Sequence, residues 1–101
     1  MLPLEVGELR VVAITKKDKR DVDIGPTLAR IDSGGKDRHP NDGSTFRNDK
    51  SRLPVKPDGY YKEFVHRTEG VKGVGPQRVV VGGGGERYYT PDHSKTFVPI
   101  K

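Results

Sequence analysis

Three residues in the second half of the chain, Glu63, Arg78 and His93, have side chains that together could break a phosphodiester bond. A carboxylate can take the proton from a ribose 2′-hydroxyl, which then attacks the adjacent phosphorus, and a histidine can protonate the departing 5′-oxygen. An arginine can donate two hydrogen bonds to phosphate oxygens and stabilise the charge that builds on them. These residue types are the ones needed to cleave RNA by internal transesterification, a reaction that requires no metal ion.

The segments that carry these residues have the composition of β-strands. We expect strands at residues 60–66, 77–81 and 87–90 and a short closing strand at 96–100, because β-branched and aromatic residues dominate them. Four consecutive glycines at 82–85 favour a hairpin with a bulge, or a close backbone approach to another group. Since neighbouring strands lie about 4.8 Å apart, three side chains on successive strands can converge on one face.

Glu63 and His93 each have a simpler explanation. The alternation of side chains along a strand puts Glu63 on one face with Tyr61 and Val65, where a carboxylate needs a partner, and a salt bridge to a neighbouring strand would provide one. His93 follows the Pro91-Asp92 turn signal and could be an ordinary surface histidine beside a hairpin. Convergence of Glu63, Arg78 and His93 is what would separate the catalytic interpretation from these alternatives.

One helix is expected, over residues 23–35. Pro26 suits its first turn, and the Gly34-Gly35 pair can end it. Ile24, Leu28 and Ile31 recur at spacings of four and three and form one apolar stripe. We expect this stripe to be buried against Val79, Val81, Phe64 or Phe97 of the later strands, because no other apolar surface is large enough to cover the helix. One helix followed by consecutive strands predicts an α+β fold, with the helix packed on a twisted antiparallel meander.

Residues 36–57 read as a long loop with turn signals at Asp42-Gly43 and at Pro54 and Pro57. Phe46 and Leu53 could anchor it, while the polar residues between them face outward. Two interpretations remain open from the residues alone: a mobile surface loop, or a loop that presents backbone N–H groups and side chains to a ligand.

The overall composition narrows the class of protein. The chain has 101 residues, 31% of them hydrophobic, and no cysteine, which predicts one small domain without disulfides or thiolate metal sites. Its net charge is +5; residues 51–101 carry nine Lys and Arg against five Asp and Glu. A basic surface attracts nucleic acid or an acidic protein, although it also serves solubility. No apolar run is long enough to cross a membrane, and we expect no membrane partner.

The first 23 residues are expected to form an arm or linker that precedes the domain. Residues 2–14 contain enough aliphatic residues for a short strand, and residues 16–21 are a charged run typical of a solvated loop. A tether for nucleic acid is the alternative for that run. The N-terminus lacks the pattern of a signal peptide, so we expect export to depend on something outside this sequence, such as a longer parent polypeptide.

Segments throughout residues 24–97 resemble the barnase-type microbial ribonucleases, the small guanyl-specific enzymes. The resemblance covers most of the chain in family order and is carried by the following segments: Thr27-Leu28-Ala29-Arg30-Ile31, Asp42 to Asn48, Arg52-Leu53-Pro54, Gly59 to Phe64, Arg78 to Gly82, and Tyr88 to His93 with Thr96-Phe97. It implies a ribonuclease domain at residues 24–101, with a helix packed on a twisted antiparallel sheet.

The resemblance also implies roles for single residues. Glu63 matches the general base, Arg78 a phosphate-binding arginine and His93 the general acid, and no cofactor or metal is implied. Phe46, Arg47 and Asn48 match the start of the loop that recognises the base. The full set of expected substrate-binding residues is Phe46, Arg47, Asn48, Asp49, Lys72, Tyr61 and Tyr89.

The sequence departs from the family pattern at three places. Asp49-Lys50 replaces the usual Arg-Glu pair, in which the glutamate reads the guanine edge. Val74 replaces a second arginine, a charge that Lys72 could supply only as a point charge. Ser94 replaces the tyrosine that usually follows the catalytic histidine. We therefore expect the catalytic core to be kept and guanine preference to be weakened.

Two functional classes follow. The favoured one is a metal-independent endoribonuclease acting on single-stranded RNA through a 2′,3′-cyclic phosphate. In this interpretation it is a toxin domain, secreted or delivered into the cytoplasm of a target cell, monomeric when free and inhibited by an acidic immunity protein. The alternative is a non-catalytic basic module on the same fold that binds RNA or an acidic protein.

Overall fold

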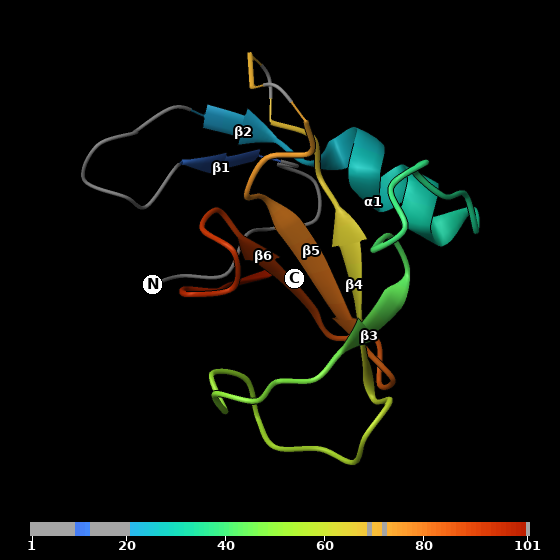
Figure 1. Cartoon of the computed structure of the whole chain (residues 1–101), viewed down its shortest axis with the longest axis vertical. Coiled ribbons are helices and arrows are strands. Elements are labelled where there is room, and N and C mark those ends of the chain that lie inside the picture. Colours follow the sequence, from blue (N-terminus) through green and yellow to red (C-terminus); the bar gives the residue numbers. More distant parts are fainter. Residues whose placement is uncertain (1–9, 13–20, 69, 72, 101) are drawn as a thin grey trace.

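The computed structural model describes residues 10–12, 21–68, 70–71 and 73–100 (Figure 1). Within these residues the chain forms one helix, α1 (Gly25–Asp32), which is too short to cross a membrane. The strands, in chain order, are β1 (Arg10–Val12), β2 (Asp21–Asp23), β3 (Ser44–Phe46), β4 (Tyr61–Val65), β5 (Arg78–Gly82), β6 (Arg87–Thr90) and β7 (Val98–Ile100). Of the expected charged loop at 16–21, only Asp21 is described, and it lies in β2; the rest of that loop and Lys72, with its expected role, fall outside the described residues.

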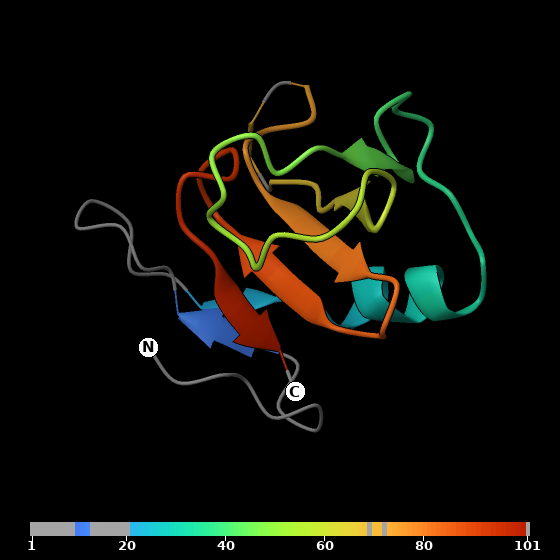
Figure 2. The ribbon, with the colours of Figure 1, turned by 90° about the horizontal axis from the view of Figure 1, so that it is seen from below.

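The strands form two antiparallel sheets. β3, β4, β5, β6 and β7 pair in chain order, so the main sheet is the expected meander. β1 and β2 pair separately, and β2 leads directly into α1 (Figure 1). Figure 2 shows the same chain turned by 90°, with α1 and the long loop after β3 in different regions around the main sheet. The predicted α+β fold, with one helix packed on an antiparallel meander, is confirmed, and the meander has five strands.

Local sequence explains where α1 begins and ends. Pro26 lies in the first turn, as expected, because its missing N–H needs no partner there. Gly34 has a φ of +77°, and the N–H of Gly35 bonds to the Arg30 carbonyl at 2.9 Å, which closes the last turn. The helix covers eight residues, fewer than the predicted 23–35.

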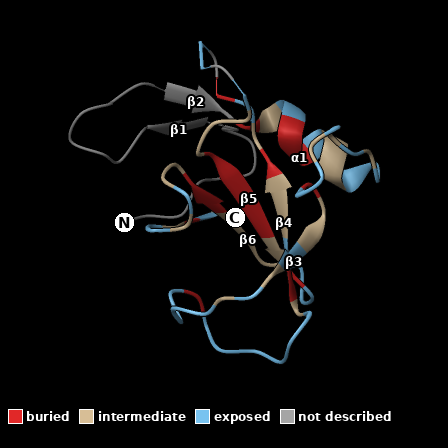
Figure 3. Cartoon of the chain, viewed as in Figure 1, coloured by how far each residue is buried: buried red, intermediate tan, exposed pale blue. Residues whose placement is uncertain are grey.

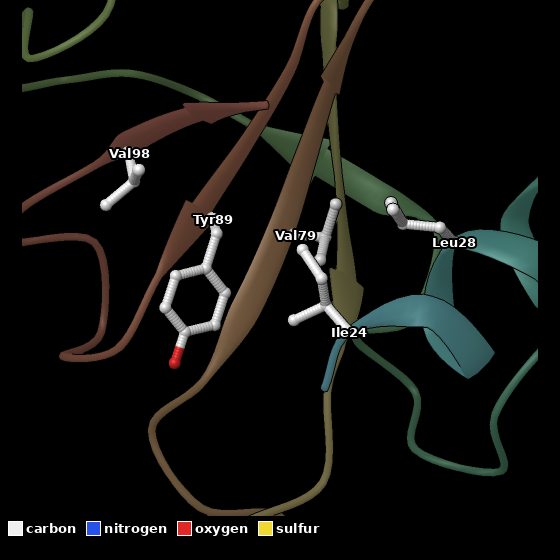
Figure 4. Close-up of a cluster of buried hydrophobic side chains, with 5 residues drawn as sticks. All are labelled: Ile24, Leu28, Val79, Tyr89 and Val98. Atoms are coloured by element: carbon white, nitrogen blue, oxygen red, sulfur yellow. The ribbon is translucent and has the colours of Figure 1, made fainter. Parts of the chain in front are cut away.

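One hydrophobic core lies between α1 and the main sheet. Figure 4 shows the fully buried cluster, which consists of Ile24, Leu28, Val79, Tyr89 and Val98. Ile31 and Val81 pack against it from its edge. The prediction that the helix stripe packs on Val79 and Val81 is confirmed, but the alternative contact with Phe97 is wrong, because Phe97 packs in a second cluster.

The second cluster contains the aromatic residues that approach one another edge to face. Its buried members are Leu53, Tyr61 and Val80, and Phe46, Tyr60, Tyr88 and Phe97 pack around them. The Phe46 and Phe97 rings lie 5.7 Å apart at 69°, a favourable geometry for an aromatic pair. Leu53 and Phe46 thus anchor the two ends of the loop segment between them, as predicted.

β3 was not predicted, because its three residues lie in a stretch dominated by turn signals. It forms because Ser44 to Phe46 pair with Glu63 to Tyr61 of β4. The preceding residue, Asp42, strengthens this junction: its buried carboxylate accepts hydrogen bonds from the Arg30 side chain at 2.7 Å and from the Val65 N–H at 2.8 Å. Asp42 therefore ties α1, the turn before β3 and the end of β4 together.

The glycine run after β5 allows a close approach, as expected. A Cβ on Gly82 would lie 2.7 Å from the Glu86 side chain, and one on Gly84 would lie 2.9 Å from the Tyr60 hydroxyl oxygen. Tyr60 donates a hydrogen bond to Glu86 at 2.7 Å. Burial differs strongly between two parts of the main sheet. Figure 3 shows that most of β5 is buried, whereas the loop after β3 is largely exposed.

Candidate active site

Glu63 occupies the middle of β4, which has a paired strand on each side. It pairs with Ser44 of β3 and with Val80 of β5. Burial raises the pKa of the half-buried Glu63 carboxyl, while the positive charge of Arg78 and the Ser44 hydroxyl act in the opposite direction. A carboxylate whose pKa is raised toward neutrality is a better proton acceptor than a fully solvated one.

His93 lies on the turn between β6 and β7 (residues 91–97), and its side chain is exposed, as predicted. The backbone is left-handed at His93 and Ser94, with φ of +56° and +67°. The His93 N–H bonds to the Pro76 carbonyl at 3.0 Å, and the Ser94 N–H bonds to Thr90 Oγ1 at 2.9 Å. These contacts hold an unusual backbone conformation, which is typical of functional sites.

Asp92 organises the same turn from inside. Its carboxylate accepts hydrogen bonds from the Thr96 N–H at 2.9 Å, the Thr96 hydroxyl at 2.7 Å and the Thr90 hydroxyl at 3.0 Å. Burial acts to raise the pKa of Asp92, but these hydrogen bonds outweigh it and the pKa is lowered. Asp92 is therefore ionised at neutral pH and fixes the position from which His93 projects.

Arg78 begins β5 on the same face as Glu63, because it lies two residues from Val80, the partner of Glu63. Its side chain is nearly enclosed, with 5% of the residue exposed. Its Nη1 donates to the carbonyl oxygens of Gly75 and Gln77, both at 2.7 Å. Arg78 thus acts on Glu63 through its charge, from behind the surface of the site.

Glu63 and His93 line one open cavity of about 440 Å³. Residues 46–50, which begin with the residues expected to recognise the base and are called the recognition segment below, also line this cavity. The lining residues are Thr45, Phe46, Arg47, Asn48, Asp49, Lys50, Arg52, Glu63, His93 and Ser94. The structure therefore brings the candidate base, the candidate acid and the recognition segment to a single site.

The recognition segment has a defined shape that its own side chains maintain. Asn48 has a φ of +55°, and its side chain donates to the Leu53 carbonyl at 3.0 Å and accepts from the Leu53 N–H at 3.1 Å. Leu53 itself is buried. A loop tied in this way can present Asp49 and Lys50, both exposed, to a ligand.

The sequence model of the ribonuclease family matches residues 9–101. This chain belongs to the ribonuclease family. The match begins 15 residues before the expected domain start at 24 and includes the β1–β2 pair.

Known relatives of this ribonuclease include guanyl-specific enzymes. It is 41% identical over 71 residues to guanyl-specific ribonuclease St of Saccharopolyspora erythraea, covering 70% of each chain. It is 40% identical over 72 residues to guanyl-specific ribonuclease Sa of Kitasatospora aureofaciens, covering 70% of this chain and 75% of that one. The ribonuclease is accordingly an endoribonuclease of the guanyl-specific type, and RNA is its substrate.

Solved structures of ribonuclease Sa2 have a backbone fold similar to that of this chain. The crystal structure of ribonuclease Sa2 with guanosine-2′-cyclophosphate superposes with a TM-score of 0.78 at 37% identity, covering 100% of this chain and 97% of that one. The structure of ribonuclease Sa2 with 3′-GMP gives a TM-score of 0.73 at 36% identity, with the same coverage. Ribonuclease Sa2 therefore shares the fold of the ribonuclease described here.

Two expected substrate-binding tyrosines of the ribonuclease have different positions. Tyr89 is fully buried in the core beneath α1, where its hydroxyl donates to the Gln77 side chain. The prediction that Tyr89 binds substrate is therefore wrong, because its side chain does not reach the surface. Its place follows from the register, which pairs Tyr89 with Val79 on the helix-covered face. Tyr61 is also buried, but it lines a second cavity of about 610 Å³ on the recognition segment, and its hydroxyl donates to the Pro54 carbonyl at 2.6 Å.

Sequence reasoning did not select Arg52 as a site residue. The Arg52 side chain reaches the Ser94 carbonyl, 42 residues away, at 3.3 Å. No local pattern signals such a contact. Among the described residues, no three His, Cys, Asp or Glu side chains gather as a metal site would require.

Proposed function

We propose that this ribonuclease cleaves single-stranded RNA by metal-independent transesterification, with Glu63 as general base and His93 as general acid. The observation that carries the proposal is the cavity in which the half-buried Glu63 carboxyl, with its raised pKa, and the exposed His93 lie together. Proton acceptance and proton donation at one phosphate are the two tasks of this reaction.

In the proposed first step, Glu63 takes the proton of the 2′-hydroxyl and the O2′–P bond forms. The P–O5′ bond breaks, and His93 gives its proton to the departing 5′-oxygen. The products are a 2′,3′-cyclic phosphate and a free 5′-hydroxyl, so atoms and charges balance. Ribonuclease Sa2, which is similar in structure, has been crystallised with guanosine-2′-cyclophosphate, a finding that supports this route.

Arg78 contributes charge to this reaction. Its guanidinium lies on the same face as Glu63 and favours the ionised carboxylate needed for proton acceptance. Its two backbone hydrogen bonds keep it in place while the reaction proceeds. We expect Arg78→Ala to reduce turnover, because loss of this positive charge makes the Glu63 carboxyl harder to ionise.

Base recognition is assigned to the segment of Phe46, Arg47, Asn48 and Asp49, with Tyr61 behind it. The exposed Lys50 occupies the position where the family usually has a guanine-reading glutamate, and a lysine side chain cannot accept a hydrogen bond. We therefore propose a guanine preference weaker than is usual in the family.

Cleavage of RNA in excess EDTA, with detection of 2′,3′-cyclic phosphate ends, tests the proposed function. Glu63→Gln, purified in the same way, is the matched control for contaminating nucleases, because it keeps the shape of the side chain and removes its charge. Cleavage by the wild type and not by the variant is expected. RNA binding without cleavage by the wild type would instead favour a non-catalytic binding module on the same fold.

The biological setting is a further part of the proposal. The net charge of +5 suits release into a medium or a target cell where RNA is the substrate, as in a toxin domain that acts as a monomer. A producing cell would need an inhibitor, and a small acidic immunity protein would fit a cavity with Arg47, Lys50 and Arg52 at its surface. Association that is faster at low salt would support this partner; an inhibitor bound elsewhere, with a salt-independent rate, would contradict it.

A further inference from the structure

Arg52 is an exposed cation on the wall of the cavity that contains Glu63 and His93. It comes from the loop between β3 and β4, whereas His93 comes from the turn between β6 and β7. The Arg52 Nη1 donates to the Ser94 carbonyl at 3.3 Å, directly after His93 in the chain. Arg52 therefore joins the recognition segment to the turn of the candidate general acid.

Both ends of this connection are fixed. The residue after Arg52 is the buried Leu53, whose N–H bonds to the Asn48 side chain at 3.1 Å. Ser94 is held through its own N–H by the buried Thr90 at 2.9 Å. Because its backbone and its acceptor are both anchored, the guanidinium is restrained over the cavity, which lowers the entropy lost when it binds a ligand.

Arg78 cannot offer hydrogen-bond donors to a ligand in the cavity from its present position. It is 5% exposed, does not line the cavity, and commits its Nη1 to two backbone carbonyls. Arg52, within the described part of the chain, donates to one carbonyl only, and a guanidinium has five N–H donors. The remaining donors of Arg52 are available to an anion in the cavity.

Two other cations line the cavity, Arg47 and Lys50. Both belong to the recognition segment, and among the described residues neither is hydrogen-bonded to the turn at 91–97. Arg52 alone of the three combines a place on the cavity wall with a contact beside His93.

We propose that Arg52 is a catalytic residue that donates hydrogen bonds to the non-bridging oxygens of the reacting phosphate. This inference rests on the proposed function and deepens it. Charge grows on these oxygens as O2′ attacks, and a pre-positioned guanidinium beside the general acid stabilises that charge. Arg78 supplies the buried positive charge behind Glu63, and Arg52 supplies the donors at the surface.

The first test compares Arg52→Ala with Lys95→Ala. Lys95 is exposed on the same turn as His93 and does not line the cavity, so its loss removes the same charge without removing a proposed contact. The substrate is the dinucleoside monophosphate GpC, whose one phosphate is the reacting one. We expect Arg52→Ala to lower kcat by about 10²-fold, the usual effect of one lost transition-state donor, and Lys95→Ala to change it little. Arg52→Lys should restore only part of the loss, because an ammonium lacks the fork of donors.

Equal effects of Arg52→Ala and Lys95→Ala would overturn the proposal, since they would show that only the net positive charge of the protein affects the rate. A loss seen on long RNA and absent on GpC would also overturn it, because Arg52 would then contact a neighbouring phosphate. Circular dichroism melting of each variant separates these outcomes from unfolding.

Binding of 3′-GMP to the Glu63→Gln protein, measured by calorimetry, gives a readout that does not depend on turnover. Adding Arg52→Ala in this background should weaken binding about tenfold or more, and adding Lys95→Ala should not. If the wild type fails to cleave RNA while this binding difference holds, the proposed reaction fails and the phosphate contact stands. Unchanged binding in the Arg52 variant would contradict the contact itself.

Discussion

The two faces of the main sheet bury similar residues and do different things. On the helix-covered face, α1 closes over Val79, Tyr89 and Val98, and none of these three residues lines the two cavities described above. On the other face, a loop covers only part of the sheet, and Glu63 of β4 reaches an open cavity. The helix-covered face, called the sealed face below, holds a buried cluster of side chains. On the other face, called the open face, the loop anchored by Phe46 and Leu53 leaves room for a ligand.

The histidines illustrate this difference. His66 lies at the end of β4 toward the helix side, where its Nδ1 and the Thr27 hydroxyl share a hydrogen bond of 2.7 Å and its ring contacts Tyr89. His93 projects from a turn at the edge of the open face. The same residue type is therefore hydrogen-bonded inside the protein on the sealed face, and on the open face it lines the cavity in which we propose proton transfer.

The largest effect should come from the open face. We expect His93→Ala and Glu63→Gln each to lower turnover by roughly 10²–10⁴-fold, the usual contribution of one positioned acid or base. Initial rates on a defined RNA measure this effect. His66→Ala is the control from the sealed face and should leave turnover per folded molecule nearly unchanged. Loss of cleavage in His66→Ala but not in His93→Ala would reverse the assignment of the two faces.

Substitutions on the sealed face should lower the stability of the protein without changing its catalytic rate. Leu28→Ala leaves a cavity between α1 and β5, and such substitutions cost about 2–5 kcal/mol of unfolding free energy. Urea unfolding measures the loss, and kcat under conditions where the variant is folded should stay within about twofold. A drop in kcat without a drop in stability would show that the helix side reaches the active site.

Base preference should change moderately on the open face. We expect GpC to be cleaved faster than ApC by much less than the roughly 10⁴-fold that a site built to hydrogen-bond one base can reach. The ratio of kcat/KM for the two substrates measures this preference. A strong guanine preference that Asp49→Ala abolishes would show that Asp49 has taken over the reading of the base.

The smallest effect concerns pH and Glu63. Because burial raises the pKa of Glu63 above its ordinary value of 4.5, the folded protein favours the protonated form, and stability falls as the pH rises from 4.5 through the folded-state pKa. Glu63→Gln should therefore be slightly more stable than the wild type at pH 7, with no such gain below pH 4.5. Thermal melting across this range measures the difference.

The catalytic rate should also depend on the raised pKa of Glu63. The acid limb of the pH–rate profile should lie above pH 4.5, because the base must be ionised. An acid limb at or below this value would contradict a desolvated Glu63. So would a stability difference between Glu63→Gln and the wild type that does not grow in favour of the variant from pH 4 to pH 7.

Local patterns were sufficient for several features of this protein. Successive side chains of a strand point to opposite faces, so the placement of Glu63 with Tyr61 and of His66 on the opposite face could be predicted from the strand at Tyr61–Val65 alone. Pro26 and Gly34 similarly marked the two ends of α1, within a few residues. Each of these features depends on backbone preferences or on side-chain periods within a single element.

Other features required the assembled sheet. Tyr88 and Tyr89 are adjacent and chemically identical, and only the register with β5 decides that Tyr89 enters the sealed core while Tyr88 packs in the second cluster. β3 exists because β4 offers it a partner, and propensity alone does not predict three such residues as a strand.

The amino-acid sequence by itself determined the kinds of chemistry available: a carboxylate on a strand, a histidine after a turn, and a basic surface. Tertiary structure decided which of these side chains meet. Glu63 gains its raised pKa from burial among neighbouring strands, and Arg52 reaches Ser94 across 42 residues of chain. Desolvation and contacts between distant segments depend on how elements pack, and no local period or propensity encodes that packing.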